Sequence, residues 1–226
     1  PKLDVNKREI MFDRVPQPRI DRNWVAPGRT TKDDVLLSLA TQVLGGGKTS
    51  RLYKHLIDDL QIATSATAQN SSHELLSFYS VTVDAKADAD LNTVESEMEA
   101  VMAEFLDRGP TAAELSRAKA GIKAGILRGL EQIGGFGGKA VTLAQGALYA
   151  DDPGFILKQL DWLDAATPQE VLRAAREVMN AGHYQLTVLP FPEYSTAESS
   201  VDRSTGIPAV TSTPDLSFPA VQETTS

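Results

Sequence analysis

The sequence contains no cysteine, no long apolar run and no excess of positive charge. Without cysteine there is no disulfide, no cysteine-ligated zinc and no cysteine nucleophile. No run approaches the roughly 20 apolar residues that a membrane-spanning helix needs. Lys and Arg number 22 against 30 Asp and Glu, a net charge of −8, which weighs against a nucleic-acid-binding protein. The 226 residues, 42% of them hydrophobic, suffice for one large domain or two small ones.

Histidine is also scarce, and the three that occur form no metal-binding pattern. His55, His73 and His183 belong to neither a His-x-x-Glu-His nor a His-Glu-x-x-His sequence. A catalytic zinc needs three protein ligands, and no local cluster supplies them. We expect His55 on a helix surface and His73 in a turn. The residues alone therefore predict no catalytic residue and no metal site in this chain.

Glycine, in contrast, is concentrated in two segments that resemble parts of a phosphate-binding loop. Residues 45–49 read Gly-Gly-Gly-Lys-Thr, but Gln42 stands where that loop needs glycine, and a predicted helix precedes the glycines. Residues 134–139 fail in the same way, because Ile133 and Ala140 occupy required positions. We interpret the first segment as a helix stop and the second as a break between two helices.

Hydrophobic periodicity predicts a strand, two helices, a strand pair, a series of helices and a last strand. Thr111 with Glu114 and Thr167 with Glu170 are capping-box pairs that mark two of the helix starts. This order predicts an α+β fold with helices packed on one face of the sheet. The predicted strands are residues 19–25, 61–69, 75–83 and 183–189, and the predicted helices are about 32–44, 50–58, 91–108, 112–130, 139–149, 151–160 and 168–179.

The two ends of the chain differ in composition from its middle. Residues 1–17 are polar and predict an N-terminal connector or a short helix, and residues 18–192 predict the folded domain. From residue 192 onward, 13 of 35 residues are Ser or Thr and four are Pro, so residues 193–226 predict a linker. The absence of an initiator Met leads us to expect a fragment of a longer protein.

One stretch of the sequence carries a more specific signal than its helix and strand pattern. Residues 43–54 read VLGGGKTSRLYK and residues 60–65 read LQIATS. Together they resemble the C-terminal domain of the M16 zinc metallopeptidases, the family of pitrilysin, insulin-degrading enzyme and mitochondrial processing peptidase. The resemblance covers roughly residues 16–192 and continues, in the right order, at 105–114, 133–139, 166–168 and 189–192.

The resemblance implies a LuxS/processing-peptidase-like fold with a mixed, largely antiparallel sheet and helices on one face. It implies a non-catalytic domain that supports an adjoining catalytic domain and walls a peptide chamber. In the family, zinc is bound by a His-x-x-Glu-His motif in the N-terminal domain, so zinc is expected in the parent protein and not in this chain. The expected partners are that domain, the second half of the parent protein and a peptide substrate.

A second interpretation stays open, in which the parent is a catalytically inactive paralogue and this chain is a polypeptide-binding or structural module. A parent protein without a His-x-x-Glu-His sequence would support this second interpretation. Because related bacterial proteins are often exported, a periplasmic location is the expectation.

The resemblance also directs attention to particular residues. Lys48, Arg51 and Tyr53 at the glycine stop are candidates for contact with substrate or with a neighbouring domain. The alternative is that Arg51 and Tyr53 serve only as the start of a helix that packs on its neighbours. Gly137, Gly138 and Lys139 are the second group of contact candidates. The alternative is that the glycines only break the chain so that two helices can cross.

At two positions the sequence differs from those halves of M16 proteins that hold the substrate. Those halves carry a Tyr in the strand after the short helix and an Arg in the next strand. The corresponding residues here are Thr64 and Ser77, with Tyr79 close enough to stay open. Thr and Ser supply neither the ring nor the charge that would hold a peptide carbonyl. The pattern therefore fits the second domain of the zinc-bearing half better than a substrate-gripping half.

Overall fold

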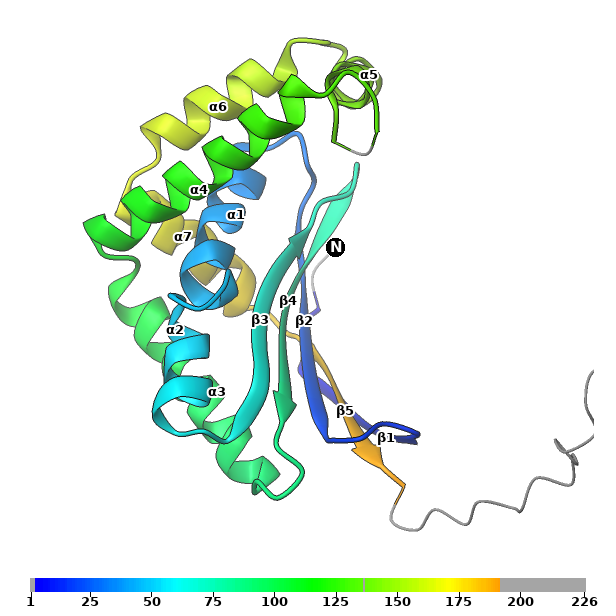
Figure 1. Ribbon diagram of the computed structural model, residues 1–226, viewed down its shortest axis with the longest axis vertical. Helices are drawn as coiled ribbons and strands as arrows, with labels where there is room; N and C mark the ends of the chain where they lie inside the picture. The colour runs from blue at the N-terminus through cyan, green and yellow to red at the C-terminus, as the bar shows by residue number, and fades with distance from the viewer. Residues whose placement is uncertain (1–2, 136, 192–226) are drawn as a thin grey trace, which may run out of the picture. The chain divides into compact units, whose positions relative to one another are not determined.

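The computed structural model describes residues 3–135 and 137–191, which form a sheet with a layer of helices (Figure 1). The strands are β1 (Lys7–Asp13), β2 (Arg19–Pro27), β3 (Ala63–Ser71), β4 (Leu76–Ala85) and β5 (Tyr184–Pro190). The helices are α1 (Lys32–Gly45), α2 (Arg51–Tyr53), the π-helical η1 (Lys54–Asp59), α3 (Leu91–Arg108), α4 (Ala112–Glu131), α5 (Lys139–Ala150), α6 (Phe155–Ala165) and α7 (Pro168–Met179).

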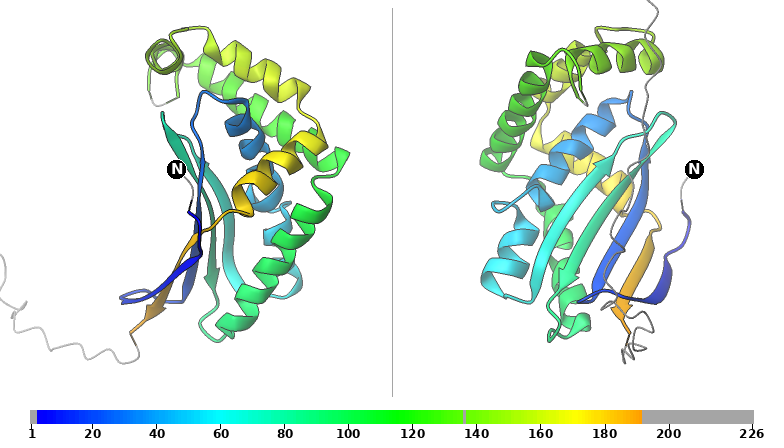
Figure 2. Two further views of the ribbon diagram at one scale, coloured as in Figure 1. Left: turned by 180° about the vertical axis from the view of Figure 1, so that it is seen from behind. Right: turned by 45° about the vertical axis from the view of Figure 1, so that its right-hand side comes forward.

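The five strands form one mixed sheet in the order β1-β5-β2-β4-β3. Only β1 and β5 are parallel, and every other pair is antiparallel. Three views show the helices gathered on one face of this sheet (Figures 1 and 2). The predicted α+β fold, with a largely antiparallel sheet and helices on one face, is confirmed.

The core lies between that face and the helices. Along β2, Ile20, Trp24 and Ala26 are buried and alternate with partly exposed residues, as expected for a strand with one covered face. Helix α1 is the central helix of the layer, and ten of its 14 residues are buried. Its apolar side chains fill the space over β2, β3 and β4, so this short segment organises most of the core.

A charged residue also lies on the covered face. Arg22 of β2 is only 4% exposed. Its guanidinium donates to Gln185 of β5 (2.7 Å) and to the carboxylates of Glu95 (3.0 Å) and Glu99 (2.7 Å) on α3. Arg8 of β1 also pairs with Glu95. Since a buried charge is tolerated only when it is paired, this network fixes α3 over β2 and β5.

Both predicted capping boxes are confirmed. The Thr111 hydroxyl accepts from the backbone N–H of Glu114 (3.2 Å), and the Glu114 carboxylate accepts from the N–H of Thr111 (2.8 Å). Thr167 and Glu170 make the same reciprocal pair at the start of α7. These contacts satisfy backbone donors that the first helical turn leaves without partners.

The N-terminal segment corrects the sequence interpretation. Residues 7–13 lie within the predicted 1–17 connector, yet they form strand β1. The sequence KREIMFD lacks the alternation of apolar and polar residues that marks a half-buried strand, and all seven residues are exposed. The strand exists because it pairs with β5, from Lys7 beside Tyr184 to Asp13 beside Pro190. A partner about 177 residues away in the sequence leaves no local signal.

Two smaller differences concern element boundaries. The predicted helix over 50–58 consists of the three-residue α2 and the wider turns of η1. The helix predicted over 151–160 is α6, which runs from Phe155 to Ala165, because residues 151–154 form the turn that closes α5. The predicted linker at 193–226 lies outside the described residues.

One glycine sets how closely the helical layer approaches the sheet. A Cβ atom on Gly45, the last residue of α1, would lie 2.0 Å from the backbone N of Ala68 in β3. It would also lie 2.5 Å from the carbonyl carbon of Thr67. Backbone atoms cannot rotate away as a side-chain tip can. The end of α1 therefore rests directly on the β3 backbone, and only glycine allows this contact.

We predict that Gly45→Ala lowers the free energy of unfolding by about 2 kcal/mol or more, because the methyl group forces α1 away from β3. Urea unfolding followed by circular dichroism measures this change. The matched control is Gly121→Ala in α4, where an added Cβ meets no atom within 4 Å. There alanine should stabilise the helix by up to about 1 kcal/mol. Equal effects of the two substitutions would contradict the close contact.

Candidate functional site

Arg51, the first residue of α2, is held by the start of α4. Its Nε donates to Oε1 of Glu114 (2.9 Å), and one terminal nitrogen donates to Oε2 of the same carboxylate (2.8 Å). That nitrogen also reaches the carbonyl oxygen of Gly109 (2.9 Å). The guanidinium lies 5.5 Å from the ring centre of Phe105. Its side chain is 16% exposed, so Arg51 is positioned chiefly to join α2, α3 and α4.

Glu114 therefore has two functions. It closes the capping box of α4 and accepts both prongs of the Arg51 guanidinium. The hydrogen bonds from Arg51 outweigh the effect of burial and lower the pKa of Glu114 to about 2. The Ser-Arg-Leu sequence after the glycine stop thus has a structural explanation in this chain.

The other two residues of the first group are more accessible. Lys48 is exposed in the turn between α1 and α2, where Gly47 has a φ of +133°. Tyr53 is half-buried at the end of α2. The glycines follow a helix, not a strand, so the segment lacks the strand–loop–helix geometry that places phosphate at a helix N-terminus.

The second group lies in the loop between α4 and α5. Gly137 has a φ of +83°, and a Cβ on Gly138 would lie 2.4 Å from the carbonyl oxygen of Gly134. The backbone N–H of Lys139 donates to the carbonyl of Gln132 (2.8 Å), which closes the loop onto the end of α4. The glycines thus permit a tight reversal between two helices, and Lys139 is exposed at the start of α5.

The structure does not bring the two groups together. Arg51 contacts the first turn of α4, whereas residues 137–139 follow its last turn. The 20 residues of α4 span about 30 Å. A single contact site made of both groups is therefore excluded by the length of this helix.

Thr64 and Ser77 are also far apart. Thr64 lies at the end of β3 beside Asp84, whose carbonyl accepts from its hydroxyl (3.3 Å). Ser77 is fully buried at the other end of the hairpin, and its hydroxyl accepts from the backbone N–H of His73 (3.2 Å). Asp84 lies seven residue steps from Ser77 along β4, or about 23 Å. Tyr79 is fully buried in the core. None of the three side chains presents a substrate-gripping group at a common surface.

The histidines lie in separate environments. His55 is half-buried on η1, with Nε2 2.6 Å from a carboxylate oxygen of Glu97. His73 follows β3 and contacts the ring of Phe78. Burial, and then the charges of Arg22 and Arg8, lower the pKa of His183. Within residues 3–135 and 137–191, no three His, Asp or Glu side chains are grouped to hold a metal ion.

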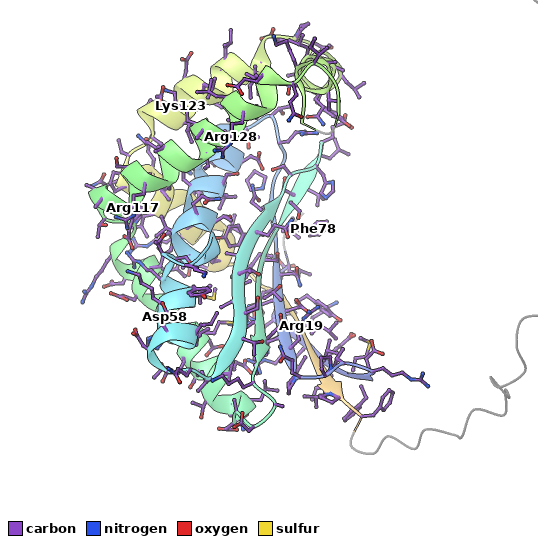
Figure 3. All side chains as sticks on the ribbon, viewed as in Figure 1. Arg19, Asp58, Phe78, Arg117, Lys123 and Arg128 are labelled. Atoms are coloured by element: carbon purple, nitrogen blue, oxygen red, sulfur yellow. The ribbon has the colours of Figure 1, made fainter. Side chains whose placement is uncertain are left out.

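The sequence does not lead us to predict one surface, the face of the sheet that no described helix covers. The face of the sheet away from the helices, which we call the open face, carries Phe78 (46% exposed) beside Val25 on the adjoining strand. Leu75 at the hairpin turn is 87% exposed. Figure 3 shows Phe78 and Arg19 on this side of the sheet, opposite the helical layer. The signal was available, because Phe78 and Val25 alternate with the buried residues of their strands.

Helix α5 is a second apolar surface without cover among the described residues. Its inward side is polar: Gln145 accepts from Arg29 (3.2 Å), and the Arg29 guanidinium lies 4.8 Å from the ring centre of Tyr149. Its outward side is apolar, and Leu143 and Leu148 are 42% and 71% exposed. The outward face, as defined here, consists of Ala140, Leu143, Ala144, Ala147 and Leu148, which share one side of the helix and are all exposed.

The Arg51–Glu114 pair generates a pH-dependent prediction. The folded state favours ionised Glu114, so its contribution to stability is complete above the ordinary pKa of 4.5 and is lost as pH falls toward 2. At pH 7, Glu114→Gln should lower the free energy of unfolding by about 1–3 kcal/mol. The gap between wild type and variant should narrow below pH 4.5, as measured by urea unfolding at several pH values.

Glu131→Gln, at the exposed last residue of the same helix, is the control and should follow the wild-type profile at every pH. A constant gap between wild type and Glu114→Gln down to pH 2 would show that Arg51 does not favour the ionised carboxylate.

A family model described as the peptidase M16 inactive domain matches residues 2–122, more than half of the chain. No curated protein sequence matches. No helix in the described part of the chain combines the length and apolar character needed to cross a membrane.

Solved structures share the fold. A protease from Helicobacter pylori superposes with a TM-score of 0.75 at 20% identity, over 84% of this chain and 45% of that one. A peptidase M16 inactive domain from Pseudomonas fluorescens gives 0.70 at 17% identity, with coverage of 84% and 45%. The periplasmic protease PqqL from Escherichia coli gives 0.63 at 15% identity, with coverage of 83% and 21%.

This chain spans less than half the length of each of these three proteins. At such identities the structural likeness shows the fold alone, and the family assignment depends on the sequence match over residues 2–122. That match agrees with the glycine stop, the following helix start and the strand after it, which all lie within the matched range. The chain belongs to the M16 peptidase family and is one of its inactive domains.

Proposed function

We propose that this chain is the non-catalytic domain of an M16-type zinc endopeptidase and that it supports the adjoining catalytic domain. One observation carries this proposal: the domain leaves two apolar patches without cover among its described residues, the one around Val25, Leu75 and Phe78 on the open face of the sheet and the outward face of α5. The proteins from Helicobacter pylori and Pseudomonas fluorescens are more than twice as long as the part of them that this chain matches. A second domain is the natural cover for both surfaces.

The two surfaces suit each other as helix and sheet. Apolar sheet faces are stably covered by helices, and apolar helix faces by sheets. The family resemblance implies that the adjoining domain has the same fold. Two such domains facing each other would each place an α5-type helix on the open face of the other. One contact would then remove both uncovered surfaces of this domain from water, at about 25 cal/mol for each Å² of apolar area.

Zinc does not fit the residues of this domain. The described part of the chain groups no three metal-ligating side chains, and its histidines lie on η1, after β3 and before β5. We therefore propose that zinc and the groups that act on the peptide belong to the adjoining domain. This chain would contribute rigidity and part of the wall of the peptide chamber. A periplasmic location is proposed as well, supported by the fold shared with the periplasmic PqqL.

The alternative, a polypeptide-binding module of an inactive paralogue, uses the same surfaces and differs only in the partner. The first 250 or so residues encoded upstream of Pro1 distinguish the two. A His-x-x-Glu-His sequence there supports the peptidase, and the same fold without that sequence supports the inactive paralogue.

The supporting role is tested with this chain and the preceding domain produced as separate polypeptides. We predict that they associate and that Phe78→Glu on the open face and Leu148→Glu on α5 each weaken binding about tenfold or more, because each buries an unpaired charge. Isothermal titration calorimetry measures the affinities, and circular dichroism checks that the exposed substitutions leave the fold intact.

The matched control is Leu60→Glu, which is 41% exposed at the end of η1. It should bind like wild type. If the two polypeptides do not associate, or if Leu60→Glu weakens binding as much as the other two variants, neither surface supports the neighbouring domain.

A further inference from the structure

His183 lies directly before β5, and the proposed function gives it no role. Its ring contacts the ring of Trp24 in β2, with 5.5 Å between the two ring centres. The atom Nε2 is buried and meets no hydrogen-bond partner among the described residues. A neutral imidazole tolerates this position, because Nε2 can then carry a lone pair and no proton. An imidazolium carries a proton on both nitrogens, so Nε2 would become a buried donor without an acceptor.

The charges around the ring add to this cost. Four charged side chains act on it from the neighbouring elements: Arg22 of β2, Arg8 of β1, and Glu95 and Glu99 of α3. Both carboxylates already pair with the two arginines. In the last turns of α7, the helix that precedes β5, Glu177 pairs with Arg173 (3.0 Å). Burial and the two guanidinium groups therefore prevail and lower the pKa of His183 below its ordinary value of 6.5.

The backbone of His183 also holds the N-terminal segment. Its N–H donates to Oδ1 of Asn6 (3.2 Å), and its carbonyl accepts from the N–H of Lys7 (2.8 Å), the first residue of β1. The N–H of Gly182 donates to the carbonyl of Leu3 (2.9 Å). A Cβ on Gly182 would lie 2.5 Å from that carbonyl oxygen, so the two backbones are in direct contact. The residue that resists protonation thus lies where the N-terminal segment joins β5.

Little else secures β1. It lies at the edge of the sheet with β5 as its neighbour (Figure 2), and all seven of its residues are exposed. The strand therefore buries little apolar surface. Segments of this kind open locally at a free energy well below that of global unfolding. When β1 leaves β5, Arg8 leaves the surroundings of His183, and a proton on the imidazole becomes less costly.

We propose that His183 is a proton-sensitive latch: its neutral ring keeps residues 3–13 on β5, and protonation of the ring releases them. The two states differ by one proton, which the open state binds more readily. The closed state is therefore fully favoured above pH 6.5, the ordinary pKa of histidine, and loses stability as pH falls below that value. The latch needs no adjoining domain, so it is independent of the proposed function.

Hydrogen–deuterium exchange of the 226-residue chain at pH 7.5 and pH 5.5 tests the latch. After correction for the intrinsic pH dependence of exchange, the amides of residues 3–13 should exchange about fivefold to tenfold faster at pH 5.5, as expected for one linked proton. The amides of β4, in the middle of the sheet, should keep their rates. In proton NMR, the Cε1 proton of His183 should titrate with a midpoint below pH 6.5.

Two variants remove the titrating ring. His183→Phe keeps an aromatic ring against Trp24, and His183→Gln is a second substitution in case phenylalanine disturbs the packing. In both, exchange of residues 3–13 should no longer depend on pH. The matched control is His55→Gln, which removes the histidine of η1 that lies 2.6 Å from Glu97 and should keep the wild-type response.

Three results would overturn the latch. The first is equal exchange of residues 3–13 at the two pH values in the wild-type chain. The second is the same acceleration in both His183 variants, since another group would then bind the proton. The third is an equal acceleration of β4, because the proton would then lower the stability of the whole domain and not release one segment.

Discussion

A β-sheet has two faces, and the arrangement of this domain follows from shielding one of them within the described chain. Helix α1 packs over β2, β3 and β4, and α3 is held over β2 and β5 by the buried Arg22. On the other side, the strands alternate Val25 and Phe78 with buried residues and meet no helix of the described chain. This asymmetry separates a surface that stabilises the domain from one that is available to a partner.

The most specific sequence motif of the chain proves to be a packing device. Gly45 allows α1 to end against the β3 backbone, and Arg51 after the glycine stop binds the first turn of α4 through Glu114. Glycine stop, arginine and capping-box glutamate thus form one connected unit across three helices. Packing geometry explains this unit, and a family motif need not mark a catalytic site.

Most of the fold could be predicted from local patterns. The alternation in β2 and β4, the capping boxes at Thr111 and Thr167 and the glycine stops placed the elements near their observed positions. Strand β1 could not, because its existence depends on β5, a partner at the far end of the sequence. The surface of α5 was missed for a related reason. Its periodicity indicates a helix, but no local pattern tells which side faces the domain.

The pairing of β1 with β5 also bears on how the domain folds. Among the described strands, β1 has β5 as its only neighbour, so it has nothing to pair with until the last strand exists. Leu3 likewise meets Gly182. Contacts across such separations carry a large loop-closure entropy and slow folding. On the ribosome, β1 is synthesised before β5 and must wait for it, so residues 7–13 leave the tunnel long before their place in this sheet is made.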